Sequence, residues 1–185
     1  MLVILSGPSG VGKDTVLKAW SATNPLVVRV VAYTTRAMRP GEVDGIDYHF
    51  VTPDEFQARV DRGAFLEHKE VHGNLYATPL EDMERLLAEG KIAVLKIDVQ
   101  GALTAMELRP DAKSIFLLPP STEELEARIR GRATDDEATI QKRLENAREE
   151  LAVADRYQHR VVNRDIDQAV TELEGLVRQT ANASC

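Results

Sequence analysis

The sequence Gly7-Pro8-Ser9-Gly10-Val11-Gly12-Lys13-Asp14-Thr15 follows a short apolar run at residues 2–5 and precedes a segment with helical character at residues 13–22. Backbone N–H groups in a glycine-rich turn can converge on an anion, and the positive end of the following helix adds to the attraction. A lysine at this place supplies a cation to the outer phosphates of a nucleotide. The order of strand, loop and helix therefore predicts that these nine residues bind a nucleoside triphosphate.

One position departs from the common pattern G-x-x-x-x-G-K-[ST], because Asp14 stands where a hydroxyl is usual. A carboxylate beside a triphosphate is unfavourable unless a cation lies between them. Asp14 could therefore face Mg²⁺ or one of its waters, since Mg²⁺ prefers oxygen ligands. It could instead stabilise the first turn of its own helix, whose N-terminal end favours negative charge. The sequence leaves both interpretations open.

Strand-like and helix-like segments alternate along the rest of the chain, which predicts an α/β fold with a mostly parallel sheet covered by helices on both faces. Further strands are expected at residues 26–32, 92–97, 114–118 and 159–162. Further helices are expected at residues 53–62, 79–89, 121–129, 137–154 and 166–177, with a short one after residue 98. Asp98 closes a strand at its carboxyl end, where a carboxylate can hold Mg²⁺ through water or cap the next helix.

Composition limits the classes of partner. The 185 residues suit one domain with a real hydrophobic core, and the net charge of −7 argues against generic binding to nucleic acid or to an anionic membrane. The single cysteine, Cys185, excludes an internal disulfide. The apolar run at residues 2–5 is too short for a signal peptide, and no stretch reaches the length of a membrane span. A cytoplasmic protein is expected.

Three further blocks of sequence stand out. They are Tyr33-Thr-Thr-Arg-Ala-Met-Arg-Pro-Gly-Glu-Val-Asp-Gly-Ile-Asp-Tyr48, the pair Phe65-Leu-Glu67 and Val71-His-Gly-Asn-Leu-Tyr76-Ala-Thr78, and Ile97-Asp-Val-Gln-Gly-Ala102. Together with the glycine-rich loop, these blocks resemble guanylate kinases. The resemblance covers nearly the whole chain. It implies a P-loop kinase fold, ATP and GMP as substrates, and Mg²⁺ as the cofactor. It also implies a core of residues 1–32, 79–129 and 155–185, an inserted GMP-binding subdomain at 33–78, and a lid with its helix at 130–154.

The resemblance assigns six residues to GMP, and their chemistry agrees. Four offer hydrogen-bond donors suited to a phosphate dianion, namely Arg36, Arg39, Tyr48 and Tyr76. Glu67 can accept two hydrogens from guanine, a pair that adenine does not present. Thr78 matches a hydroxyl position near the base and is also expected to cap the helix that follows it.

Phosphoryl transfer depends mainly on positioning and charge neutralisation. Lys13 of the glycine-rich loop is expected to share these roles with Arg132 and Arg143, which fit the family pattern best, and Arg128 and Arg148 are further candidates. From their own chemistry, Asp98 and Asp14 are the candidate metal ligands, although Asp14 departs from the family pattern. Ala32 and Lys96 depart from the family pattern near the base, where a serine and an acidic residue are common. Two alternatives stay open: a related ribose bisphosphate kinase, suggested by the Gly-Lys-Asp sequence, and a non-catalytic guanylate-kinase-like binding module.

Overall fold

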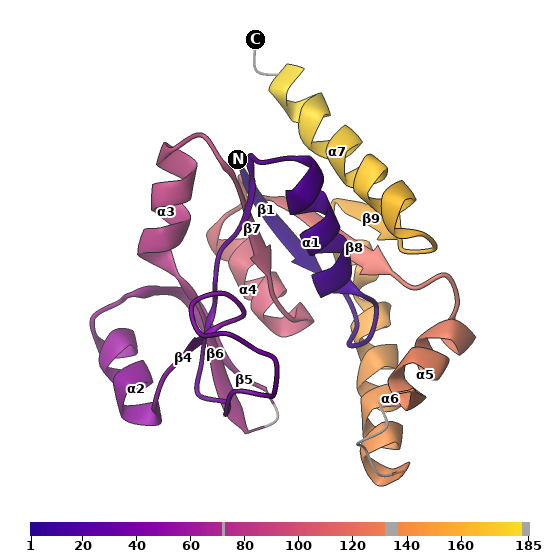
Figure 1. Ribbon diagram of the computed structural model, residues 1–185, viewed down its shortest axis with the longest axis horizontal. Helices are drawn as coiled ribbons and strands as arrows, with labels where there is room; N and C mark the ends of the chain where they lie inside the picture. Colours follow the sequence, from indigo (N-terminus) through magenta and orange to yellow (C-terminus); the bar gives the residue numbers. More distant parts are fainter. Residues whose placement is uncertain (72, 132–136, 183–185) are drawn as a thin grey trace. The chain divides into compact units, whose positions relative to one another are not determined.

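The computed structural model describes residues 1–71, 73–131 and 137–182, with the backbone alone from residue 179 onward (Figure 1). The chain forms two compact units. The first comprises Met1–Ile4 and Leu26–Ala112, and the second comprises Leu5–Pro25 and Lys113–Cys185. Within the described residues, no helix is both long and apolar enough to cross a membrane.

A five-stranded sheet carries the alternating part of the chain. Its order is β2 (Val27–Arg29), β7 (Ile92–Lys96), β1 (Leu2–Ser6), β8 (Lys113–Leu118) and β9 (His159–Val162). The pairs β2–β7 and β8–β9 are both parallel, and helices occupy the intervening sequence. All five residues of β1 are buried, as are the four central residues of β8. The prediction of an α/β fold with a mostly parallel sheet is therefore confirmed.

The first unit also carries a second, four-stranded sheet. Its order is β4 (His49–Phe50), β3 (Tyr33–Thr34), β6 (Asn74–Pro79) and β5 (Phe65–Val71), with helices α2 (Pro53–Asp61), α3 (Leu80–Ala88) and α4 (Val99–Leu108) in the same unit. Helix α2 begins with the capping box formed by Thr52 and Glu55, as its sequence predicts. Its Phe56 ring lies 5.0 Å from the ring of Phe65, which joins the helix to the sheet.

The second unit contains helices α1 (Lys13–Thr23), α5 (Thr122–Arg130), α6 (Glu137–Ala152) and α7 (Ile166–Asn182), and a short 3₁₀ helix at Ala154–Arg156. Helices α1 and α7 lie side by side (Figure 1). One carboxylate joins them, because Glu174 Oε1 accepts hydrogen bonds from Trp20 Nε1 at 2.8 Å and from Asn24 Nδ2 at 2.6 Å. Buried Trp20 is thus both packed and hydrogen-bonded.

Two expected elements differ from the structure. The predicted strand at residues 26–32 forms only as β2, Val27–Arg29. The chain then moves to the second sheet, where Ala32 O accepts a hydrogen bond from His49 N and Tyr33 begins β3. The predicted cap at Thr78 is also wrong, because Thr78 lies in β6 and Pro79 is the N-cap of α3, with no side-chain cap. The Thr78 side chain has another partner.

Candidate functional site

The glycine-rich loop joins β1 to α1, as predicted. Gly12 is the N-cap of α1 and adopts a left-handed backbone conformation with φ of 97°, which glycine tolerates best. At Gly7, a Cβ atom would lie 2.4 Å from the carbonyl oxygen of Leu117 in β8. The loop therefore needs glycine at these two positions, one for backbone geometry and one for close packing against the sheet.

Two side chains hold the outer side of this loop. The carbonyl oxygen of Val11 accepts hydrogen bonds from Asn163 Nδ2 at 2.8 Å and from Arg128 Nη1 at 3.3 Å. Asn163 is buried, and a Cβ on Gly12 would lie 2.7 Å from its Nδ2 atom. The backbone of the loop is thus held by Asn163, which directly follows β9, and by Arg128 of α5. The sequence contains no local signal for this bracing.

The chemistry of the loop matches an anion site. Lys13 Nζ donates to the carbonyl oxygens of Gly7 and, at 3.0 Å, of Pro8. Ser9 N donates to Glu150 Oε2 of α6 at 3.1 Å, so a carboxylate oxygen already accepts from a loop N–H group. The remaining predicted residues lie as expected: Gly10 and Val11 in the loop, and Asp14 and Thr15 exposed in the first turn of α1.

In the first unit, the structure brings together three of the residues assigned to the GMP phosphate. The rings of Tyr48 and Tyr76 lie 5.8 Å apart, edge to face, and the guanidinium of Arg36 lies 5.6 Å from the centre of the Tyr48 ring. Tyr76 also contributes to the raised pKa of Arg36, after Glu42, which is the main cause. Arg39 is exposed in the neighbouring turn.

Glu67 and Thr78 form a buried hydrogen-bonded pair. They face each other across β5 and β6, next to an irregularity in β5 between Phe65 and Glu67. Thr78 Oγ1 donates to Glu67 Oε1 at 2.6 Å, and Glu67 is only 6% exposed. Burial raises the pKa of the Glu67 carboxyl, and the negative charge of Asp98 adds to the rise. A buried, oriented acceptor of this kind can distinguish between ligands by the hydrogen-bond donors that they present.

Asp98 caps helix α4. Its Oδ1 atom accepts a hydrogen bond from Gly101 N at 2.7 Å. The capping role considered for Asp98 is therefore confirmed, and the second carboxylate oxygen is compatible with a water-bound cation. In the described ranges, no group of three or more His, Cys, Asp or Glu side chains is arranged to hold a metal ion.

Three of the four predicted lid and hinge-side arginines lie on helices that the structure describes. Arg128 belongs to α5 and contacts the phosphate loop, as described. Arg143 and Arg148 belong to α6, the first half-buried and the second exposed. Arg132 lies outside the described residues, and its role stays a prediction.

Three further residues contact the cluster of Arg36, Tyr48 and Tyr76, and none of them had a predicted role. Glu42 Oε1 pairs with Arg36 Nη2 at 2.7 Å, and its Oε2 accepts from Arg39 N at 2.7 Å. Arg29 and Lys96 place their cations 5.4 and 5.6 Å from the centre of the Tyr48 ring. Glu42 belongs to a motif block and Lys96 departs from the family pattern, so the sequence carried a signal for both. For Arg29 it carried none.

Comparisons with known proteins identify the family of this chain. The family model described as guanylate kinase matches residues 1–180. A guanylate kinase of Alcanivorax borkumensis is 46% identical over 176 residues, covering 95% of this chain and 85% of that protein. A guanylate kinase of Synechococcus elongatus is 44% identical over 176 residues, covering 95% and 96%.

Solved structures give the same result. The crystal structure of guanylate kinase from Anaplasma phagocytophilum has a TM-score of 0.78 and 34% identity, and the match covers 97% of this chain and 85% of that one. A shikimate kinase from Bacteroides thetaiotaomicron has a TM-score of 0.52 at 18% identity, which is a likeness of fold alone. On the extent and identity of these matches, the chain belongs to the guanylate kinase family.

Proposed function

We propose that this protein transfers the γ-phosphoryl group of ATP to GMP, giving ADP and GDP. The observation that carries the proposal is the buried Glu67–Thr78 pair on the same sheet as Tyr76, which lies beside Arg36 and Tyr48. A carboxylate that accepts from N1–H and N2–H selects guanine, and a nearby set of guanidinium and phenol donors suits its phosphate. Arg39 is proposed to join this set.

The loop Gly7-Pro8-Ser9-Gly10-Val11-Gly12-Lys13-Asp14-Thr15 is the proposed ATP site. In the reaction, an oxygen of the GMP phosphate forms a bond to the γ-phosphorus, and the bond from that phosphorus to the β–γ bridging oxygen breaks. The attacking phosphate is already ionised, so no general base is needed. Lys13, Arg132 and Arg143 are the proposed groups that stabilise the charge in the transition state.

Mg²⁺ is the proposed cofactor. Proteins usually hold this ion through one or two carboxylates together with substrate phosphates and water, and Asp98 and Asp14 supply oxygen atoms of that kind. When bound, the ion would neutralise charge on the phosphates of ATP. Because the substrates are cellular nucleotides, we place the activity in the cytoplasm.

Acceptor specificity tests the proposal. ADP production is measured with GMP, AMP, UMP and ribose 1,5-bisphosphate as acceptors, and GMP should be used far better than the others. Glu67→Ala should lower kcat/KM for GMP. The decrease should correspond to a loss of about 2–4 kcal/mol of transition-state binding, which is the scale expected when hydrogen bonds to a charged group are removed.

Other outcomes of this assay have definite meanings. Preference for ribose 1,5-bisphosphate would replace the proposal by the sugar kinase alternative. No ADP production with any acceptor would favour a binding module. Equal use of AMP and GMP would refute the role given to Glu67.

A further inference from the structure

Gly101 has no backbone reason to be glycine. It is the third residue of helix α4, within the first turn, and it is not among the glycines with positive φ. In helix interiors alanine is favoured over glycine by about 0.5–1 kcal/mol because glycine loses more conformational entropy, and the same preference applies in weaker form in the first turn. The missing side chain therefore calls for an explanation in packing.

The space beside Gly101 is taken by the Glu67 carboxylate. A Cβ atom on Gly101 would lie 3.0 Å from Glu67 Oε2 and 3.5 Å from Glu67 Cδ. Contacts of 3.0 Å are closer than ordinary van der Waals packing between carbon and oxygen, so the carboxylate would have to move. On its other oxygen, Glu67 is held by the Thr78 hydroxyl at 2.6 Å.

The Glu67 carboxylate thus lies between a hydrogen bond on one side and the Cα of Gly101 on the other. Because Glu67 is buried, its carboxylate cannot move out into solvent to relieve a close contact. Moving away from a new methyl group would strain or break the hydrogen bond from Thr78. A shift of a few tenths of an ångström would also change the geometry of both proposed hydrogen bonds to guanine, which share this acceptor.

We propose that Gly101 is a positioning residue for base specificity: its lack of a side chain sets the place of the Glu67 carboxylate against guanine. This inference rests on the proposed function. The backbone N–H of Gly101, which donates to Asp98 Oδ1, remains in an alanine variant. A Cβ on Gly101 would lie 3.5 Å from Asp98 Oδ1, which is an ordinary van der Waals contact, so substitution crowds Glu67 and is compatible with the cap of α4.

Gly101→Ala is the test, and Gly175→Ala is its matched control. Gly175 also lies in a helix, α7, and a Cβ there would meet no atom within 4 Å. We expect Gly101→Ala to raise the KM for GMP about tenfold, with the KM for ATP unchanged. Gly175→Ala should leave both constants unchanged. Thermal unfolding of each variant, followed by circular dichroism, shows whether a change in KM merely reflects lost stability.

A double-mutant cycle separates positioning from a general packing effect. If Gly101 acts through Glu67, Gly101→Ala should have no further effect on GMP in the Glu67→Ala background. An unchanged KM for GMP in Gly101→Ala, or an equal effect with and without Glu67, would overturn the inference. Failure of the wild-type protein to phosphorylate GMP would instead refute the proposed function itself, so the two failures are distinguishable.

Discussion

Glu42 joins the two arginines proposed to bind the GMP phosphate. Its carboxylate pairs with the Arg36 side chain and accepts from the Arg39 backbone, and the Arg36 and Glu42 side chains are only 12% and 20% exposed. Two effects oppose each other, because Glu42 orients Arg36 but its charge repels a phosphate. The ion pair is largely shielded from water, so we expect orientation to dominate.

Glu42→Gln should accordingly raise the KM for GMP about three- to tenfold, with a smaller change in kcat, because Arg36 would lose its fixed orientation before the phosphate arrives. Steady-state kinetics with varied GMP measure this. Glu70→Gln is the control, since Glu70 is an exposed glutamate on strand β5 of the same unit. A lower KM in Glu42→Gln would mean that charge repulsion is the larger effect.

Asp14 tests the metal interpretation of the phosphate loop. If its carboxylate contacts Mg²⁺ or a water of its shell, Asp14→Ala should raise the Mg²⁺ concentration for half-maximal rate and leave the KM for GMP nearly unchanged. The measurement is a Mg²⁺ titration at saturating ATP and GMP. An unaltered Mg²⁺ requirement would assign Asp14 to the helix end, where the first turn of α1 favours a negative charge.

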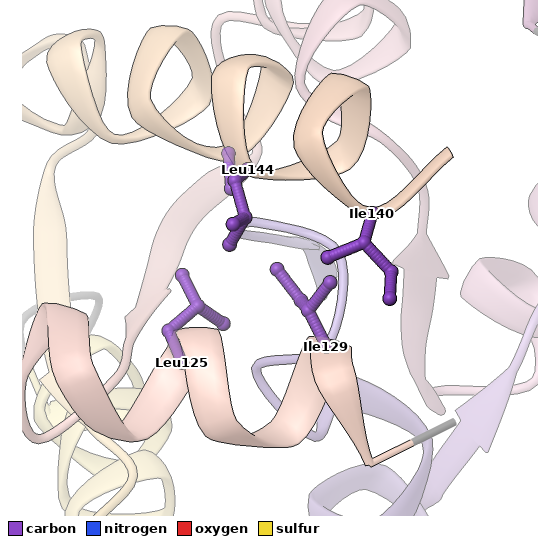
Figure 2. Close-up of a cluster of buried hydrophobic side chains, with 5 residues drawn as sticks. Leu125, Ile129, Ile140 and Leu144 are labelled. Atoms are coloured by element: carbon purple, nitrogen blue, oxygen red, sulfur yellow. The ribbon is translucent and has the colours of Figure 1, made fainter. Parts of the chain in front are cut away.

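Helices α5 and α6 pack through one apolar cluster, which Figure 2 shows as Leu125 and Ile129 facing Ile140 and Leu144. Ile129 has a second neighbour, because a Cβ on Gly10 of the phosphate loop would lie 3.2 Å from Ile129 Cγ1. Ile129 is 2% exposed and Leu144 is 7% exposed, so both contribute to the cluster.

The two residues should differ in their effect on ATP. Ile129→Ala and Leu144→Ala should each lower the free energy of unfolding by about 2–4 kcal/mol, since each leaves a cavity in the same cluster. Ile129→Ala alone should also raise the KM for ATP several-fold, because it removes support beneath the loop. Urea unfolding and ATP kinetics check the two parts. Equal KM values in the two variants would exclude that support.

The stability of the whole protein should depend on pH through titrating side chains whose effects on stability have opposite signs. Burial lowers the pKa of His159, and the charge of Lys113 adds to this, so the unfolded chain binds more protons there than the folded one. Stability from His159 is therefore present above about pH 6.5 and is lost as pH falls below it. The raised pKa of Glu67 acts in the opposite direction, because protonation removes a burial cost.

At lower pH a second loss should follow. The hydrogen bond from Arg36 lowers the pKa of Glu42, so its stabilising effect disappears as pH falls below the ordinary glutamate range.

The effect of His159 is tested nearer neutral pH. Melting temperature should decline between pH 7 and 5.5, and His159→Gln should flatten that decline. Differential scanning calorimetry in matched buffers tests this. An identical slope in the variant would show that other groups control the change.

Local features of the fold could be predicted from the chain alone. The strand, loop and helix around residues 2–23 and the capping box of α2 depend on residues a few positions apart, so short patterns contain their whole physical cause. The family blocks likewise gave Arg36, Tyr48, Glu67, Tyr76 and Thr78 as candidate site residues. Within one unit, the structure places the first, second and fourth in one cluster and the other two in a hydrogen-bonded pair.

The tertiary structure determined the contacts between residues far apart in the sequence, which short patterns cannot encode. Thr78 was expected to cap a helix, but its hydroxyl turns to Glu67 across a strand pair. Val11 is held by Asn163, 152 residues away, and Gly101 meets Glu67 from a different element. These contacts depend on which strand and helix ends the fold places side by side. No local propensity specifies that placement, because it results from burying the whole core at once.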